Sequence, residues 1–155
     1  MNLRRFLIDV VVFTGAIVIT CSTAFAQEGR GALFALLSGG NGVDAETGEA
    51  GAGDSNGHGS ATVIIVDSDT LCYGVTVNRI DPPTAMHIHQ AAAGLNGPVV
   101  ISLTPPATGN PGAWSDCISP IDEMLLNQIR IRPAIFYVNV HNPAFPNGAV
   151  RGQLY

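Results

Sequence analysis

Histidines are the side chains of this chain whose type and spacing best fit a chemical role. His87 and His89 stand two residues apart in a segment, residues 84–90, that is expected to form a β-strand. Side chains two apart on a strand point to the same face. Met86 and Ile88 take the opposite face and are expected in the core, which leaves the two imidazoles on a face that the core does not need.

A second expected strand, residues 134–141 with the sequence AIFYVNVH, shows the same alternation. Its large apolar side chains Phe136, Val138 and Val140 take the core face. Tyr137, Asn139 and His141 then share the other face. His141 is therefore expected to point away from the core, as His87 and His89 do.

Imidazole nitrogens from neighbouring strands can converge on one transition-metal ion, since nitrogen ligands suit copper, zinc and nickel. The sequence predicts a metal site of His87, His89 and His141, with copper favoured over zinc because Cu(II) binds such donors more tightly. His58, in a Gly-rich segment, is a weaker candidate for a fourth ligand. The alternative is structural: each imidazole could bond a backbone carbonyl or Asn139 and pin neighbouring strands together.

Arg151 occupies a non-core position of the expected last strand, residues 149–155. It is expected to form a surface ion pair, with bidentate binding of an anionic partner as the alternative. Together with Asn139 and Tyr137 it would then contact the metal-binding histidines or a protein partner.

Catalytic motifs are otherwise missing from the sequence. No serine stands in a G-x-S-x-G elbow, and the Gly-rich stretch lacks the Lys-Ser/Thr ending of a phosphate-binding loop. These patterns favour a non-catalytic protein over an enzyme.

The first 26 residues have the pattern of an export signal. Arg4 and Arg5 precede an apolar run over residues 10–19, and Ala24-Phe25-Ala26 ends the segment. The run is shorter than the ~20 residues that span a bilayer, so cleavage before Gln27 is expected, with an uncleaved anchor as the alternative. The sequence thus predicts a signal peptide over 1–26 and an exported protein, periplasmic or extracellular, without membrane attachment after cleavage.

The remaining chain, residues 27–155, is expected to form one domain. Its 129 residues carry five arginines, no lysine and eleven acidic residues, a net charge of −6 with neutral histidines. Such an acidic protein is a poor partner for nucleic acid and for anionic membranes.

Cleavage would discard Cys21 and leave Cys72 and Cys117. A lone cysteine pair outside the cytoplasm most simply forms a disulfide, although two thiolates could also bind a metal ion.

Short apolar segments separated by Gly, Pro and Asp predict the elements that must position these residues. One helix is expected from Pro120 to about Arg130, capped by Ser119. Residues 38–59 are expected as a flexible Gly-rich loop and residues 104–117 as a Pro/Gly loop. The pattern predicts an all-β fold with one short helix, an antiparallel sandwich or barrel. Seven strands are expected, over residues 31–37, 60–67, 71–78, 84–90, 98–103, 134–141 and 149–155.

Several blocks of the sequence resemble the CHRD family, the domain named after chordin and also found in bacterial exported proteins. The blocks occur in order and span nearly all of residues 27–155. They are FALLSG (34–39), GSATV (59–63), HIH (87–89), NGPVV (96–100), YVNVH (137–141) and PNGAVRGQL (146–154).

This resemblance implies a Greek-key-like antiparallel sandwich, immunoglobulin-like or similar in shape to Cu/Zn superoxide dismutase, in a bacterial single-domain member. It implies no defined activity, since the family's biochemistry is poorly defined. His58 departs from the family pattern, which usually has a small residue there. Four histidines and no evident aspartate partner are too few for a dismutase copper–zinc pair, which leaves a mononuclear site or a structural, protein-interacting module.

Overall fold

The computed structural model of the chain describes residues 12–13, 16–17 and 31–155. β1 and β2 pair with one another as a separate two-stranded sheet. The predicted signal peptide otherwise lies outside the described residues, as does Cys21, and both expectations stay predictions. The elements are β1 Val12–Phe13, β2 Ala16–Ile17, β3 Ala32–Ser38, η1 Gly39–Asn41, β4 His58–Ile65, β5 Leu71–Asn78, β6 Ala85–Gln90, β7 Val99–Leu103, β8 Gly112–Ile118, α1 Glu123–Ile131, η2 Pro133–Ile135, β9 Phe136–His141 and β10 Val150–Gln153.

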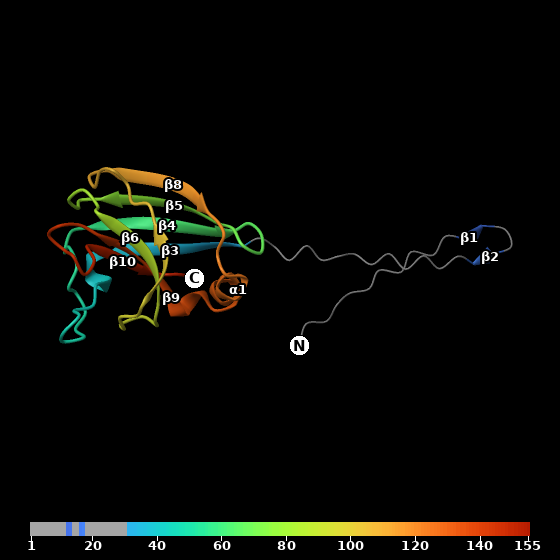
Figure 1. The fold of residues 1–155 in the computed structure, drawn as a ribbon, viewed down its shortest axis with the longest axis horizontal. Helices are drawn as coiled ribbons and strands as arrows, with labels where there is room; N and C mark the ends of the chain where they lie inside the picture. Colours follow the sequence, from blue (N-terminus) through green and yellow to red (C-terminus); the bar gives the residue numbers. More distant parts are fainter. Residues whose placement is uncertain (1–11, 14–15, 18–30) are drawn as a thin grey trace.

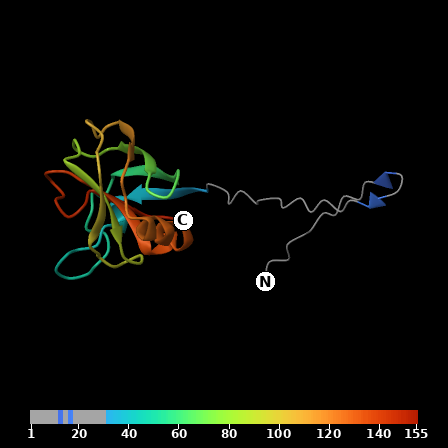
Figure 2. The same ribbon diagram turned by 45° about the vertical axis from the view of Figure 1, so that its right-hand side comes forward.

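Eight strands form one antiparallel sheet in the order β7-β6-β9-β10-β3-β4-β5-β8. The sheet curls around a core, with α1 at one end (Figures 1 and 2). β5 and β6 follow one another in the chain but lie near opposite ends of the sheet order, a long connection of the Greek-key kind. The predicted all-β antiparallel fold with one short helix is confirmed. In the described part of the chain no helix is long and apolar enough to cross a membrane.

The core lies inside the curl, because alternate side chains of each strand point inward. Strands from both halves of the sheet contribute to a single cluster, which includes Val63, Leu71, Ile88, Phe136 and Val140. Each such fully buried side chain stabilises the fold by about 1.5–3 kcal/mol. The two halves are also joined by Tyr73, whose hydroxyl oxygen accepts from the Thr104 amide at 2.8 Å and donates to the Thr104 carbonyl at 3.1 Å.

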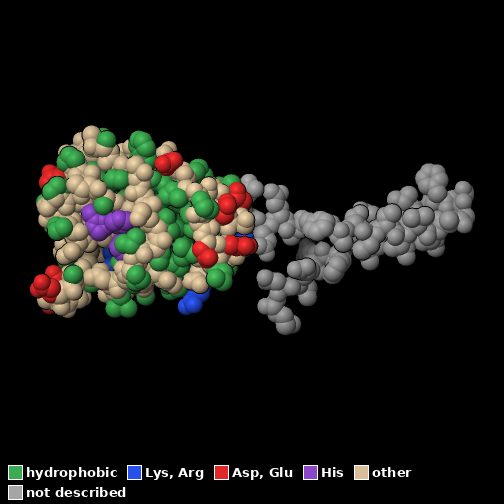
Figure 3. All heavy atoms as spheres, in the orientation of Figure 1, with side chains coloured by type: hydrophobic (Ala, Val, Ile, Leu, Met, Phe, Trp, Pro, Cys, Tyr) green, Lys and Arg blue, Asp and Glu red, His purple; other side chains and the backbone are tan. Residues whose placement is uncertain are grey.

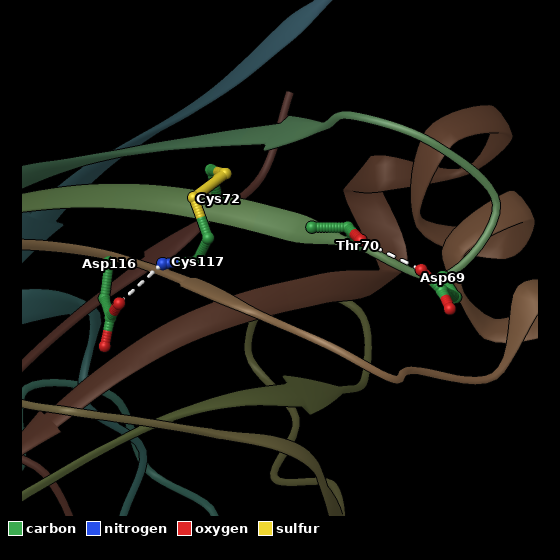
Figure 4. The surroundings of a disulfide bond; sticks show 5 residues. All are labelled: Asp69, Thr70, Cys72, Asp116 and Cys117. Carbon is green, nitrogen blue, oxygen red and sulfur yellow. Dashed lines mark hydrogen bonds between the residues drawn. A yellow bond between two sulfur atoms is a disulfide. The ribbon is translucent and has the colours of Figure 1, made fainter.

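β8 corrects the expectation of a loop over residues 104–117. It pairs with β5 from Leu71↔Ile118 to Val77↔Gly112. As an edge strand with mostly exposed side chains, it shows no apolar alternation by which the sequence could reveal it. Its cysteine lies directly opposite that of β5, and the Cys72–Cys117 disulfide bond joins the two strands (Figure 4), which confirms the predicted bridge.

α1 begins later than expected, and its cap is Asp122 rather than Ser119. The Asp122 carboxylate accepts from the Leu125 amide at 2.9 Å, as carboxylates commonly do at helix N-termini. Leu126 and Ile129 are the side chains that the helix buries at the end of the curled sheet.

The predicted flexible loop over residues 38–59 has more structure than its composition indicates. β3 extends to Ser38, β4 begins at His58, and a bridge joins Val43 to Ala50. Amides of the segment bond its own carbonyls, and Asp54 N donates to Ala149 O at 2.8 Å. Backbone bonds of this kind leave no pattern in side-chain type, so the sequence did not reveal them.

Candidate metal centre

The strand register brings the predicted histidines together. β6 pairs with β9, so that His87 lies opposite Asn139, His89 opposite Tyr137, and Ala85 opposite His141. β10 continues the sheet on the other side of β9, with Arg151 opposite Asn139. The adjacency that the sequence could only assume is therefore present, and all of the predicted side chains share the outer face of three neighbouring strands.

His87, His89 and His141 each offer one ring nitrogen to a common point. The three nitrogens lie within 4.8 Å of one another, and His87 Nδ1 is 3.2 Å from His141 Nε2. Two nitrogens bound tetrahedrally to one ion at about 2.0–2.1 Å would lie roughly 3.3 Å apart. The His87–His141 pair has this spacing, whereas the widest pair of nitrogens would have to close by about 1.5 Å for one ion to bind all three.

Backbone carbonyls fix the protonation of two of the rings. His89 Nδ1 is 2.9 Å from Gly97 O, and His141 Nδ1 is 2.9 Å from Pro146 O. A carbonyl only accepts, so each Nδ1 carries the proton and each Nε2 presents a lone pair. Metal-binding histidines commonly have this outer hydrogen bond, which orients the ring.

One of these lone pairs has no partner. His89 is 8% exposed, and its buried Nε2 makes no hydrogen bond within the described structure. A buried polar atom without a partner costs about 1–3 kcal/mol, and a metal ion would remove that cost. This nitrogen is the strongest single indication that the group is built for a ligand.

All three imidazoles are kept neutral at neutral pH. Desolvation by burial is the main cause that lowers the pKa of His87, His89 and His141 below 6.5. His141 lowers the pKa of His87 further, and the Arg151 guanidinium contributes to the lowered pKa of His89. Neutral imidazole is the form that binds a metal ion.

The lowered pKa values predict that acid destabilises the metal-free protein. The unfolded chain takes up protons on these histidines once the pH falls below about 6.5, while the folded state resists them, so the free energy of unfolding falls with pH from there. Denaturant titrations with a chelator at pH values from about 7.5 to 5.5 measure this. His87→Ala/His89→Ala should flatten the dependence. An equally steep dependence in the double variant would contradict the assignment.

Tyr137 lies between a histidine and an arginine. Its ring stacks on the His89 ring at 4.7 Å with 7° between the planes, and Cζ of Arg151 lies 3.4 Å from its centroid. The stack holds His89 from the face of its ring, while the Gly97 carbonyl holds the ring edge. His89 is therefore fixed in orientation without a metal ion.

Arg151 corrects the expectation of a surface ion pair. It is 3% exposed and donates to Leu95 O at 2.7 Å, Asn96 Oδ1 at 3.2 Å and Ala92 O at 3.4 Å. All three acceptors belong to the loop between β6 and β7. The guanidinium thus fastens that loop over the outer face of the sheet.

Asn96 and Gly97, in the loop between β6 and β7, contribute to the site, but the sequence analysis did not predict this. Asn96 Nδ2 donates to Val43 O at 3.1 Å, while Gly97 contacts both His89 and the Tyr137 hydroxyl through its backbone. A Cβ on Gly97 would lie 2.0 Å from Gln90 O, so only glycine fits there. The sequence does carry a signal, since NGPVV, YVNVH and NGAVRGQL, three blocks of the resemblance, meet at this point.

His58 lies outside the histidine group. It is the first residue of β4, paired with Ser38 and Asn78, and is exposed, with Nδ1 3.1 Å from Asn56 O. Within the described residues, the group that could hold a metal ion consists of His87, His89 and His141.

The fold and the site together define an all-β protein: a curled antiparallel sheet whose outer face carries a group of three buried or partly buried imidazoles. The CHRD domain family model matches residues 33–154, and the chain belongs to this family. Comparison with curated proteins finds no match, and neither does comparison with solved structures.

Proposed function

We propose that this protein is an exported, non-catalytic CHRD protein that binds one transition-metal ion, with copper favoured over zinc, through His87, His89 and His141. The carrying observation is the buried, unpartnered Nε2 of His89, which lies in a group of three ligand nitrogens within 4.8 Å of one another. The neutral, oriented rings support the same conclusion, because an ion would have to displace only the proton that His87 Nδ1 donates to His141 Nε2.

Donor type supports the choice of metal. All three donors of the group are imidazole nitrogens, without thiolate or carboxylate. Such a set suits Cu(II) and Zn(II), and Cu(II) lies higher in the affinity order of divalent ions. Copper is therefore the metal that we expect to be bound when both are supplied.

Export is supported by two features of different kinds. The N-terminal 26 residues have a charged start, an apolar run and an A-x-A ending. The Cys72–Cys117 disulfide bond is stable in oxidising compartments and rare in the cytosol. A protein exported to the periplasm or the medium would meet metal ions there.

Calorimetric titration of the purified protein with Cu(II) and with Zn(II) tests the metal site. We expect one copper ion per chain with a Kd below about 1 μM, and weaker zinc binding. His87→Ala/His89→Ala should weaken copper binding at least ~100-fold, because only one of three ligands remains. His58→Ala is the matched control, since it removes an exposed imidazole outside the group, and it should bind copper as the parent does. Equal affinity of the parent and the double variant would refute the site.

A structural or protein-interaction module is the second candidate function, and specific bonds favour it. His89 and His141 each bond a backbone carbonyl, and Arg151 fastens the loop between β6 and β7. In this case the histidine substitutions lower stability or partner capture, with no difference between metal-loaded and metal-free protein. Denaturation with and without copper separates the two functions.

A further inference from the structure

The coordination of the proposed metal ion would be incomplete with the three histidines alone. Copper and zinc sites hold four or more ligands, whereas this group supplies three nitrogens. His87 and His141 are only partly buried, and histidine side chains are visible on the face of the molecule that Figure 3 draws. At least one coordination position therefore faces outward and is open to a ligand from solution.

The charge around this position is positive and uncompensated. Within the described residues no carboxylate joins the group of three imidazoles. Arg151 lies on the other side of the stack that begins at His89: its Cζ is 3.4 Å from the centroid of the Tyr137 ring, and that ring stacks on His89 at 4.7 Å.

Arg151 brings no anion of its own. Its hydrogen bonds, among the described residues, go to neutral carbonyl and amide oxygens rather than to a carboxylate. A divalent ion would then bring a second positive centre to a partly desolvated face, where opposite charges attract more strongly than in bulk water.

We propose that the metal-loaded site takes a small inorganic anion at its open coordination position. This inference rests on the proposed metal function and adds the class of its second ligand. A monodentate anion offsets the charge of the metal ion and of Arg151, which a water molecule does not. The protein would therefore hold the ion as a ternary complex with an anion from the medium.

Azide is a suitable probe because its binding to Cu(II) produces a charge-transfer absorption. The protein, expressed from its full sequence and loaded with one equivalent of Cu(II), is titrated with sodium azide at constant ionic strength. We expect a saturable band with one azide per copper and no loss of bound copper. A copper-loaded protein whose absorption and electron paramagnetic resonance spectra do not respond to azide would overturn the proposal.

Arg151 variants test the origin of the affinity. Arg151→Met should weaken azide binding about three- to tenfold through loss of a nearby charge, whereas Arg151→Lys should retain most of it. Arg132→Ala is the control, because it removes an exposed arginine at the C-terminal cap of α1. Equal azide affinity of Arg151→Met, Arg151→Lys and the parent would overturn the role of charge.

Failure of the metal function has a different signature. A protein that does not bind copper retains no copper signal after gel filtration, before any azide is added, so the two proposals fail at separate steps. The Arg151 variants are compared only through copper-loaded molecules, counted by their resonance signal. A variant that folds less well is therefore not mistaken for a variant that binds azide more weakly.

Discussion

Arg151→Met should lower the free energy of unfolding by about 3–5 kcal/mol, a large share of the ~5–15 kcal/mol that holds a domain together. The substitution keeps the length of the side chain and removes its donors. Leu95 O, Ala92 O and Asn96 Oδ1 then lose the guanidinium that binds them. The three acceptors belong to exposed residues and their bonds are partly buried, so each lost bond costs about 1 kcal/mol, and the cation–π contact with Tyr137 is worth about 1–2 kcal/mol more.

Denaturant unfolding of the metal-free protein measures this effect. Arg132→Ala is the matched control and should change stability by less than about 0.5 kcal/mol, since that arginine is exposed. Arg151→Lys should recover only part of the loss, because an ammonium cannot reproduce a planar fork that reaches three acceptors. A loss below about 1 kcal/mol for Arg151→Met would show that water replaces the guanidinium easily and that the loop is not held by it.

Strand phase was the most informative feature of the sequence for the site. The two-residue spacing of His87 and His89 placed both on one face of a strand, and the alternation in AIFYVNVH placed His141 on the corresponding face of another strand. These inferences need only the geometry of a single strand. Alternation along a strand does not say which strands are neighbours. The structure shows that β6 pairs with β9, although the two strands lie far apart in the chain.

Burial of the outer face could not be predicted in this way. The alternation of apolar and polar residues assigns one face of a strand to the core, and the opposite face is then expected to be exposed to solvent. Here the loop between β6 and β7 covers part of that face, so that Tyr137, Asn139 and Arg151 are buried on it. Only long-range backbone contacts create this cover, and they leave no periodic signal.

The same limit explains the errors in the elements. β8 contributes few side chains to the core, so its sequence lacks alternation and reads as a loop. Asp122 caps α1 three residues after Ser119, and both are good capping residues, so local preference did not choose between them. Elements that bury an apolar face were predicted, and those defined by backbone pairing or by one hydrogen bond were missed or displaced.

The cover of the outer face also explains how the two candidate functions can use the same residues. The Gly97 and Pro146 carbonyls bind the Nδ1 side of two histidines and so stabilise loops. The same bonds leave Nε2 of both rings without a proton, as ligation to a metal ion requires. Structural bonds on one side of each ring are thus compatible with ligation on the other, and only the metal-dependent experiments distinguish the functions.

Loss of the disulfide bond should have an effect as large as that of Arg151. Cys72→Ala/Cys117→Ala removes a cross-link with a sequence separation of 45 residues, which the chain-entropy model values at about 4 kcal/mol. The bond also holds the edge strand β8 against β5, since the two cysteines are direct partners in the register.

β8 should therefore be released before the rest of the sheet. In hydrogen-exchange measurements, its amides should lose protection in the double variant, while those of β9, buried in the centre of the sheet, should retain most of theirs. Reductant should lower the unfolding midpoint of the parent and leave that of the variant unchanged. If reduction lowers stability by less than about 1 kcal/mol, the β5–β8 backbone pairing alone holds the edge, and the cross-link has another role. The histidine group lies on β6 and β9, away from this edge, so copper binding by the folded Cys72→Ala/Cys117→Ala variant should match that of the parent.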